Sequence, residues 1–401
     1  MTPRFTVLGG GSPFAAALVE ALRDPAAGVR PMELVLHGRT RTPLARMRAY
    51  AARRLGPLGW TVRAETELEA ALDGAAVVLH QPRYGGMRGR ARGEAFCARF
   101  GVPADETLGP AALRTAAGLG AAMARTADAL RARCPDAWVL NLTNPLSCAT
   151  ALLAEAVPRA VGLCELPVCT VAEAAAHFGL SVDEVEWAYA GLNHRGFVVA
   201  LRHGERDLLA ELPARLAGGT IGGVGGNEIA ALGALPLKYH RLLLGQPPAP
   251  GRAAYLRGVR AALLRELRDP SRVPAGLADR PMPWYGQAAV PVLAALTGGP
   301  VAHLTLNLYG EDDVVEEVQA TVDQDGVHPL PPPAVPPAAA AWLARFREHE
   351  RAVMRAVRDP SQPRLREALD ADPVVPAAMA GRMAEALARD LERERRAEVG
   401  R

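Results

Sequence analysis

The segment Phe5-Thr-Val-Leu-Gly-Gly-Gly-Ser12 decides the fold class of this 401-residue chain. Its first four residues predict a short buried strand, and the glycines that follow predict a tight turn. An Ala- and Leu-rich amphipathic stretch then continues to about Leu22 and predicts a helix. This order is typical of a nucleotide-binding βα unit, although Phe14 replaces the third glycine of the G-x-G-x-x-G pattern.

The same alternation of strand and helix recurs through the first half of the chain. Further apolar strand-like runs occupy residues Glu33–His37, Ala75–His80 and Trp138–Asn141. Strands that alternate with helices predict an α/β fold whose N-terminal part is a Rossmann-like, doubly wound parallel sheet. Ligands of such sheets bind at the carboxyl ends of the strands. We therefore expect one edge of the sheet to gather the strand-end residues Gly9, His37, Arg83 and Asn141.

The pattern changes near Gly191, and this change predicts two domains, a nucleotide-binding domain over residues 1–190 and a C-terminal domain over residues 191–401. The second part mixes strand and helix signals and includes a proline-rich connector at Pro329–Pro337. We predict a strand at Val301–Leu308, and helices at Asn227–Leu244, Ala253–Arg268, Ala338–Val357 and Ala377–Ala397.

Composition narrows the class of partner. The 46 basic and 43 acidic residues nearly balance, which does not favour a nucleic-acid partner, and no apolar run is long enough to predict a membrane span. Lys238 is the single lysine, so an anion site must be built from arginine or backbone amides. The five cysteines are odd in number and follow no zinc-finger spacing, which favours a reducing cytoplasm. A small-molecule partner is the simplest expectation.

The candidate cofactor site begins at the glycine turn. Gly9 and Gly11 supply the first two glycines of the dinucleotide pattern, and Ser12 follows them. The acidic residue expected at the end of the second strand is missing, and Arg39 lies just beyond that strand. Because an arginine at this place accommodates a 2′-phosphate, the residues leave open the choice between NAD and NADP.

Two further strand-end segments carry polar side chains. Residues 81–94 include Arg83, Arg88, Arg90 and Arg92 among several glycines, which fits either a solvated helix start or a clamp for an anion. The segment Asn141-Leu-Thr-Asn144-Pro145 also follows a strand. Asn before Pro is commonly a turn former, but paired amides at a sheet edge also suit hydrogen bonds to sugar hydroxyls.

Cys164, in Gly-Leu-Cys-Glu, and His194, in Gly-Leu-Asn-His, combine a soft thiolate with an imidazole. Such a pair suits a divalent transition metal and leaves most coordination positions open for a substrate, as in a catalytic site. The plainer interpretation is a buried small cysteine and a structural histidine. Tyr239, in Leu-Pro-Leu-Lys-Tyr-His, is by itself a packed aromatic residue.

Taken in order, these segments resemble glycoside hydrolase family 4, the NAD-dependent 6-phospho-glycosidases related to lactate and malate dehydrogenases. The resemblance covers nearly the whole chain and is carried by Gly9-Gly-Gly-Ser12, Arg83-Tyr-Gly-Gly86, Arg90 to Glu94, Phe100-Gly-Val102, Glu106-Thr-Leu-Gly-Pro110, Asn141-Leu-Thr-Asn-Pro145, Gly162-Leu-Cys164, Gly191-Leu-Asn-His194, Leu235-Pro-Leu-Lys-Tyr239 and Gly251-Arg252. It implies a C-terminal α/β substrate domain like that of lactate and malate dehydrogenases. This family is a known exception to two-carboxylate glycosidase chemistry.

The resemblance also implies a role for individual residues. Cys164 and His194 fall on the ligands of a divalent metal, usually Mn²⁺, and Tyr239 falls on the catalytic base. Glu165 falls where some members carry an acidic proton donor. The positions that bind the phosphorylated sugar correspond to Arg90, Asn144 and Arg252.

The activity implied is hydrolysis of 6-phospho-β-glucosides to glucose 6-phosphate and an aglycone, by transient oxidation at C3, deprotonation at C2 and elimination. Phosphorylated glycosides or disaccharides are then the substrates, and the chain is expected to form a homodimer or homotetramer. Three alternatives remain open: an NAD(P)-dependent hydroxyacid or sugar dehydrogenase, a divergent 6-phospho-α-glycosidase, and a non-catalytic nucleotide sensor.

Overall fold

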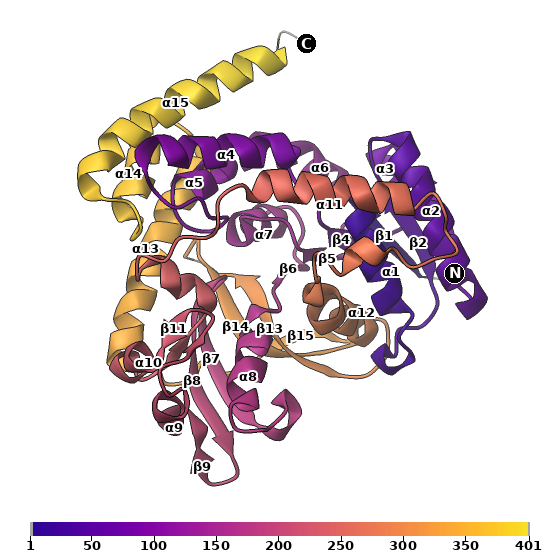
Figure 1. Ribbon diagram of the computed structural model, residues 1–401. Helices are drawn as coiled ribbons and strands as arrows, with labels where there is room; N and C mark the ends of the chain where they lie inside the picture. Colours follow the sequence, from indigo (N-terminus) through magenta and orange to yellow (C-terminus); the bar gives the residue numbers. More distant parts are fainter. Residues whose placement is uncertain (1–2, 311, 400–401) are drawn as a thin grey trace.

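The computed structural model of the protein describes residues 3–310 and 312–399. Its first half forms six parallel strands in the order β3-β2-β1-β4-β5-β6 (Figure 1). Their bounds are β1 (Arg4–Leu8), β2 (Glu33–His37), β3 (Thr61–Glu65), β4 (Val77–His80), β5 (Trp138–Asn141) and β6 (Ala160–Leu163). The predicted doubly wound parallel sheet is therefore confirmed. The strands β4 and β6 are buried along their whole length, as expected of a sheet covered on both faces.

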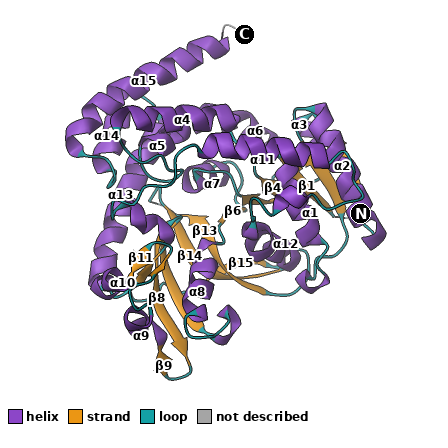
Figure 2. Ribbon diagram, in the orientation of Figure 1, coloured by secondary structure: helices purple, strands orange, loops and turns teal. Residues whose placement is uncertain are grey.

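Helices connect these strands and cover both faces of the sheet (Figure 2). The first half contains α1 (Ala16–Leu22), α2 (Arg41–Leu55), α3 (Leu68–Leu72), α4 (Gly86–Phe100), α5 (Pro110–Ala117), α6 (Leu119–Arg133), α7 (Leu146–Ala154) and α8 (Leu166–Ala176). Gly101, in the left-handed conformation with φ +64°, ends α4. These helices place the connections that follow each strand at one edge of the sheet.

The second half extends the same sheet with antiparallel strands. Strand β13 (Ala302–Tyr309) pairs with β6, and the order continues through β14 (Val315–Asp323), β7 (Glu186–Leu192), β8 (Arg195–His203) and β12 (Leu235–Pro236). The predicted strand at 301–308 corresponds to β13. Short strands complete the described sheets: β9 (Arg206–Asp207), β10 (Thr220–Ile221), β11 (Val224–Gly225) and β15 (Gly326–Pro329). Together they form the mixed α/β architecture expected of the C-terminal part.

The remaining helices are α9 (Leu208–Arg215), α10 (Gly226–Leu232), α11 (Arg252–Glu266), α12 (Val290–Leu296), α13 (Pro337–Arg358), α14 (Gln362–Ala371) and α15 (Ala377–Val399). One predicted helix, at 227–244, is wrong. It ends at Gly233, which adopts φ +62°, and the chain continues through β12 and a 3₁₀ helix at Lys238–Leu242. The apolar periodicity of this region is interrupted because a left-handed glycine ends a helix and Pro236 lacks the backbone donor that would continue one.

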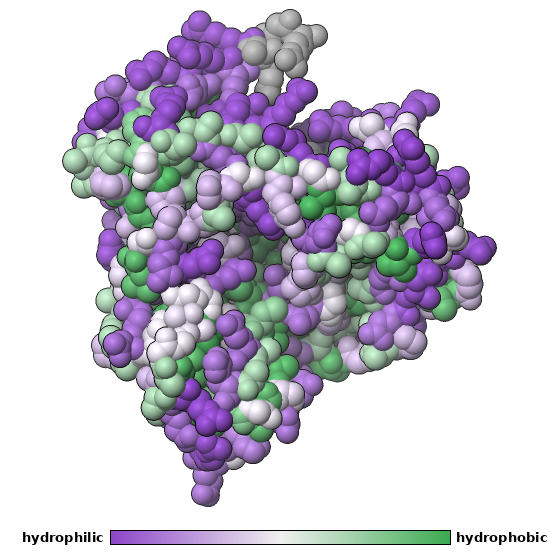
Figure 3. Space-filling model, viewed as in Figure 1, coloured by the Kyte–Doolittle hydropathy of each residue, from purple (hydrophilic) through white to green (hydrophobic). Residues whose placement is uncertain are grey.

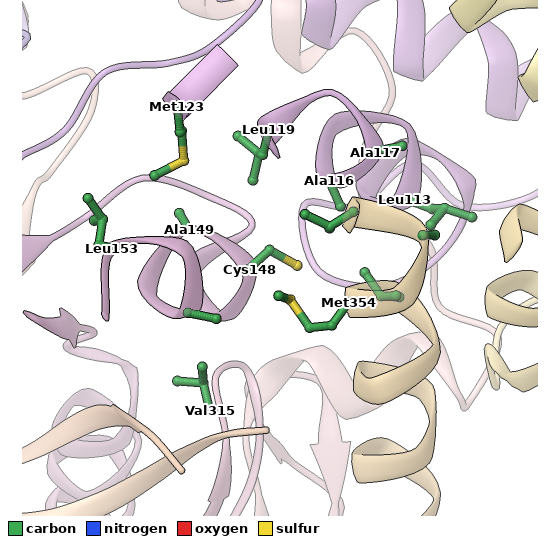
Figure 4. Packing of buried hydrophobic residues seen from close by; sticks show 14 of the residues in the cluster. Leu113, Ala116, Ala117, Leu119, Met123, Cys148, Ala149, Leu153, Val315 and Met354 are labelled. Carbon is green, nitrogen blue, oxygen red and sulfur yellow. The ribbon is translucent and has the colours of Figure 1, made fainter. Parts of the chain in front are cut away.

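Four apolar clusters of buried residues pack within the described part of the chain. One of them joins Cys148 and Ala149 of α7 to Val315 of β14 and Met354 of α13 (Figure 4). The C-terminal helices thus pack onto the nucleotide-binding half, while the end of α15 extends away from the rest of the chain (Figure 1). Among the described helices, none is both long and apolar enough to cross a membrane.

Candidate active site

A cavity of about 2080 Å³ opens at the carboxyl ends of the parallel strands. Figure 3 shows this face of the molecule hollowed near its middle. The cavity is larger than most single-ligand pockets and has room for a dinucleotide beside a sugar. All the predicted site residues line it, namely Gly9, Gly11, Ser12, Arg39, Arg90, Asn144, Cys164, Glu165, His194, Tyr239 and Arg252.

The glycine turn after β1 forms one end of the cavity. Gly9 adopts φ +88°, and a Cβ atom there would come within 3.2 Å of the backbone of Gln81. A Cβ atom at Gly11 would meet nothing closer than 3.6 Å, so this part of the turn stays open for a ligand to approach the backbone. Phe14, in the place of the third glycine, is buried, and its ring lies 4.6 Å from the guanidinium carbon of Arg280. The departure from the glycine pattern therefore supports a cation that the sequence did not reveal.

The candidate cofactor site extends from the glycine turn to the end of β2. Arg39 is exposed and lines the cavity there, next to His37, whose pKa is lowered by burial. Glu67, from the connection between β3 and α3, lines the same end. The acidic residue missing from the end of β2 thus has a candidate replacement just after the neighbouring strand β3, a place that the usual sequence pattern does not include.

The arginines after β4 form an ion-pair group. Arg83 and Arg90 both line the cavity, and both donate to the carboxylate of Glu106, with an Arg83 Nη1 to Oε1 distance of 2.8 Å. Arg90 Nε also lies 3.1 Å from Glu94. Burial alone would raise the pKa of Glu106, but the two arginines outweigh burial and lower that pKa to about 2. Much of the positive charge at Arg83 and Arg90 is therefore already balanced.

Several other cavity arginines form no ion pair among the described residues, and Arg252 and Arg280 are two of them. Within the described part of the chain, neither Arg252 nor Arg280 forms an ion pair, and Arg252 is exposed with its guanidinium carbon 5.1 Å from the ring of Tyr255. Burial, with Arg83 nearby, lowers the pKa of Arg280 to about 10. Both residues are therefore available to an anionic ligand. Arg280 follows a loop without regular structure, and no local pattern in the sequence marks it.

The two asparagines after β5 have different environments. Asn144 precedes a cis peptide bond to Pro145 and lines the cavity. Asn141 is fully buried, and its Oδ1 lies 2.9 Å from Nδ1 of His80. Its Nδ2 donates to Thr150 Oγ1 at 3.0 Å. Asn141 therefore orders the loop, and only Asn144 is placed to meet a ligand.

Cys164 and Glu165 follow β6 directly. Cys164 is 7% exposed, and burial, with Glu317 and Glu165, raises the pKa of its thiol well above the usual value. Burial also raises the pKa of Glu165, while Lys238 and Arg280 act in the opposite direction. Burial therefore shifts both groups toward their protonated forms.

His194 lies in the turn between β7 and β8. Its φ of +64° is unfavourable for a side chain of this size, and such strain is common where a side chain has a functional place. Thr107 Oγ1 lies 2.6 Å from His194 Nδ1, which leaves Nε2 without a partner among the described residues. Burial lowers the pKa of His194 to about 3, so the ring is neutral and suited to bind a metal.

Tyr239 belongs to the 3₁₀ helix at Lys238–Leu242, and its ring stacks on His194 with centroids 4.2 Å apart. Burial, together with Asp105 and other nearby acids, raises the pKa of Tyr239 well above its usual value. The Lys238 ammonium lies 5.5 Å from the centroid of the Tyr239 ring. A phenol in this place needs further positive charge nearby before it can act as a base.

The residues present fit a divalent metal with open coordination positions. No group of three or more His, Cys, Asp or Glu side chains among residues 3–310 and 312–399 is arranged to hold a metal alone. Cys164 and His194 nevertheless line the same cavity, and Asn193 between them has a buried Oδ1 with no partner. A soft sulfur, an imidazole nitrogen and an unpaired oxygen form a donor set that substrate or water would complete.

The fold and the cavity define an α/β enzyme of the dinucleotide-binding type, with its site between a parallel sheet and an antiparallel extension. The model of the family 4 glycosyl hydrolases matches residues 4–179, and the model of their C-terminal domain matches residues 189–375. The chain belongs to glycoside hydrolase family 4. It is a glycosidase, and this assignment replaces the dehydrogenase and nucleotide-sensor alternatives.

Individual relatives agree with the family assignment. A probable 6-phospho-beta-glucosidase of Bacillus subtilis is 25% identical over 391 residues, covering 88% of each chain. The solved 6-phospho-beta glucosidase of Thermotoga maritima with NAD and glucose-6-phosphate superposes with a TM-score of 0.86 over 98% of both chains at 22% identity. Malate dehydrogenase of Plasmodium falciparum superposes with a TM-score of 0.58 at 12% identity, over 90% of this chain and 99% of that one. The predicted relation to malate dehydrogenases is thus confirmed at the level of the fold.

Proposed function

We propose that this glycosidase hydrolyses 6-phospho-β-glucosides to glucose 6-phosphate and an aglycone, through transient oxidation at C3 of the sugar. The observation that carries the proposal is the stack of Tyr239 on His194, beside Cys164 and in the same cavity as the glycine turn. The names of the relatives in Bacillus subtilis and Thermotoga maritima support the substrate class.

Direct displacement is a poor fit to this cavity because its carboxylates are engaged. Glu106 pairs with two arginines, and Asp105 Oδ1 accepts hydrogen bonds from the backbone of Thr107 and Leu108 at 2.8 and 3.2 Å. A displacement glycosidase needs two carboxyl groups on either side of the bond that breaks. Glu165 forms no ion pair among the described residues and is available to act on the glycosidic oxygen.

The glycine turn is the proposed NAD site. The open backbone at Gly11 and Ser12 admits a pyrophosphate. Glu67, at the β2 end of the cavity, is proposed to accept hydrogen bonds from the ribose hydroxyls of NAD. NAD⁺ supplies a hydride acceptor for C3 when bound, and the resulting ketone makes the C2 proton acidic. NADP remains possible because Arg39 lies at the same end. Structures of the Thermotoga enzyme were solved with NAD.

The proposed metal ligands are Cys164 and His194, and the structure of the Thermotoga enzyme with manganese supports Mn²⁺ as the ion. A divalent ion supplies a Lewis acid for the sugar oxygens when bound. Thr107 Oγ1 pairs with Nδ1 of His194, which orients the ring and leaves Nε2 for the ion. Added positive charge here lowers the pKa of both neighbouring groups, the Cys164 thiol and the Tyr239 phenol.

Tyr239 is proposed to take the C2 proton, and Glu165 to protonate the departing aglycone oxygen. The raised pKa of Glu165 keeps its proton available for that step. Water then adds at C1, and the hydride returns to C3. The sugar phosphate is proposed to bind Arg252, with Arg280, Arg90 and Asn144 lining the same cavity.

A panel of nitrophenyl α- and β-glucosides and galactosides, with and without a 6-phosphate, tests the proposal. Each is assayed with NAD⁺ or NADP⁺ and Mn²⁺. We expect release of nitrophenol from the 6-phospho-β-glucoside and no net accumulation of NADH. Turnover of the α-anomers alone would instead identify a 6-phospho-α-glycosidase.

A cytoplasmic location and a homodimeric or homotetrameric assembly belong to the same proposal. All five cysteines are free, which suits a reducing compartment. Size-exclusion chromatography with light scattering would measure the assembly.

A further inference from the structure

A buried carboxylate, Glu317 of β14, lies behind the wall of the cavity that carries Cys164 and His194. It has no solvent exposure, and no arginine, lysine or histidine of the described chain forms an ion pair with it. In the sheet register it lies opposite Asn307 of β13 on one side and Gly191 of β7 on the other. A carboxylate buried without a cation is costly unless it is fully hydrogen-bonded. Its partners therefore show what the residue does.

Three donors surround Glu317. The hydroxyl of Tyr189 donates to Oε2, and Oε1 accepts from Nδ2 of Asn193 at 3.3 Å and from Nδ2 of Asn307 at 2.9 Å. Both amides therefore turn their NH₂ groups toward the carboxyl group. Both Oδ1 atoms are consequently buried without a partner.

The orientation of Asn193 has a direct effect on the candidate metal site. Asn193 precedes His194, is 1% exposed and lines the cavity. Cys164 and His194 line the same cavity as Asn193. Asn193 therefore adjoins one candidate metal ligand in the chain and shares the cavity wall with the other, and its direction is set by Glu317.

Glycines clear the space that this network occupies. A Cβ atom at Gly196 would overlap the hydroxyl of Tyr189, and one at Gly191 would overlap the backbone of Gly196. A Cβ atom at Gly162 would come within 2.9 Å of the Cβ atom of Asn307. The glycines of Gly162-Leu-Cys164 and Gly191-Leu-Asn-His194 therefore make room for the donors of Glu317, which explains their place in each segment.

We propose that Glu317 is a positioning residue of the metal site: it fixes the amide of Asn193 and so directs an unpaired oxygen beside His194, in the cavity that Cys164 also lines. The inference rests on the proposed metal ligands and adds a residue that touches neither metal nor substrate. Residues that orient metal ligands in this way commonly affect metal affinity by about 10- to 100-fold.

The test compares Glu317→Gln with Tyr189→Phe. Glutamine keeps the shape of the side chain but presents an NH₂ group, so it cannot accept from all three donors. Phenylalanine at 189 removes one donor to the same carboxylate and leaves the contact with Asn193 intact, which makes it the matched control. Mn²⁺ affinity is measured by calorimetry, and the sulfur-to-metal charge-transfer band is recorded after loading with Co²⁺. Thermal melts and NAD affinity report on the fold.

We expect Glu317→Gln to weaken Mn²⁺ binding by about 10- to 100-fold and to shift the Co²⁺ band, with NAD affinity unchanged. Tyr189→Phe should change Mn²⁺ affinity by less than about threefold. A double-mutant cycle with Asn193→Ala separates positioning from simple charge, because coupled residues give non-additive effects. If the loss from Glu317→Gln persists in full on the Asn193→Ala background, Glu317 does not act through Asn193 and the inference is overturned.

Unchanged Mn²⁺ affinity and an unchanged Co²⁺ band in Glu317→Gln would also overturn it, while loss of binding in Cys164→Ser would leave the proposed metal site standing. Full Mn²⁺ binding by Cys164→Ser would instead refute the metal site itself. If Glu317→Gln fails to fold, Asn193→Ala alone decides, because it keeps the other two donors of Glu317. Normal Mn²⁺ affinity and a normal Co²⁺ band in that variant would exclude the positioning role.

Discussion

The imidazole of His194 and the phenol of Tyr239 lie parallel, with ring centroids 4.2 Å apart and an angle of 12° between the planes. The two rings come from different elements, a hairpin turn and a 3₁₀ helix. A metal bound at His194 would therefore lie close to the hydroxyl that must lose its proton. This contact links metal binding to proton transfer.

We expect Cys164→Ser and His194→Ala each to lose Mn²⁺ affinity and glycosidase activity while keeping the fold. The two side chains lie at a cavity wall, and neither belongs to an ion-pair network that supports the core. Calorimetry measures the Mn²⁺ affinity, and circular dichroism shows whether the fold is kept. Full activity of either variant in metal-free buffer would contradict it.

Mn²⁺ affinity should rise with pH. Burial raises the pKa of the Cys164 thiol well above its usual value, so the thiol is protonated at neutral pH. It must therefore lose its proton when it binds the ion. The association constant should increase by about tenfold per pH unit until the thiol ionises on its own. His194, whose pKa burial lowers to about 3, adds no second proton. Cys164→Ser serves as the control and should show weak binding with little dependence on pH.

The sequence predicted β1, β2, β4 and β5 because each is a short apolar run before a turn, but it did not predict β3, whose residues Thr61–Glu65 form no such run. The strand-end argument predicted Gly9, His37 and Arg83 in the cavity, whereas the roles of His194, Tyr239 and Arg252 came from the resemblance to the family. Glu317 could not be found in this way. Its segment, Val315-Glu-Glu-Val, reads as a strand with one solvated face, and only the register opposite Asn307 and Gly191 shows that Glu317 is buried.

Arg280 and Glu67 were missed for a related reason. Each reaches the cavity from a connection without a recognisable pattern, and its role depends on contacts with distant segments. Phe14 illustrates the same limit, because it looks like a defect in the glycine pattern until its contact with Arg280 is seen. Local sequence signals identify elements, whereas these contacts depend on tertiary packing.

Arg252→Ala should raise KM more for 6-phosphorylated than for plain glycosides. Arg252 is exposed and has no ion pair among the described residues, so its removal tests the substrate contact alone. Losing one charged hydrogen bond costs roughly 1.5 to 3 kcal/mol. Steady-state kinetics on matched substrate pairs measures the difference, and equal losses on both would argue against a phosphate role.

Arg90→Ala is expected to behave differently from Arg252→Ala. It leaves Glu106 and Glu94 without one of their partners, so we expect a lower melting temperature together with the loss of activity. Differential scanning calorimetry would show it. If the variant has normal stability and raises KM only for the 6-phosphorylated glycosides, Arg90 instead contacts the substrate.

Arg39→Asp tests the choice of cofactor. If Arg39 faces the ribose, the change should weaken NADP binding, because a carboxylate repels a 2′-phosphate. NAD binding should be unchanged or stronger, because the carboxylate accepts hydrogen bonds from the ribose hydroxyls. Calorimetry with both dinucleotides gives the ratio of affinities. Glu67→Gln is the companion variant and should weaken NAD alone. No change in either variant would mean that the ribose binds elsewhere.

Tyr239→Phe addresses the chemical step itself. If Tyr239 removes the C2 proton after oxidation at C3, turnover in deuterated water should place deuterium at C2 of the released glucose 6-phosphate, because the base exchanges its proton with solvent before returning it. The variant deletes only the hydroxyl and keeps the ring that stacks on His194, so NAD and Mn²⁺ binding should persist while hydrolysis and exchange both slow. Mass spectrometry and proton NMR of the product measure the label. Hydrolysis at the normal rate without deuterium at C2 would exclude oxidation followed by elimination, since displacement at C1 leaves the C2 proton in place.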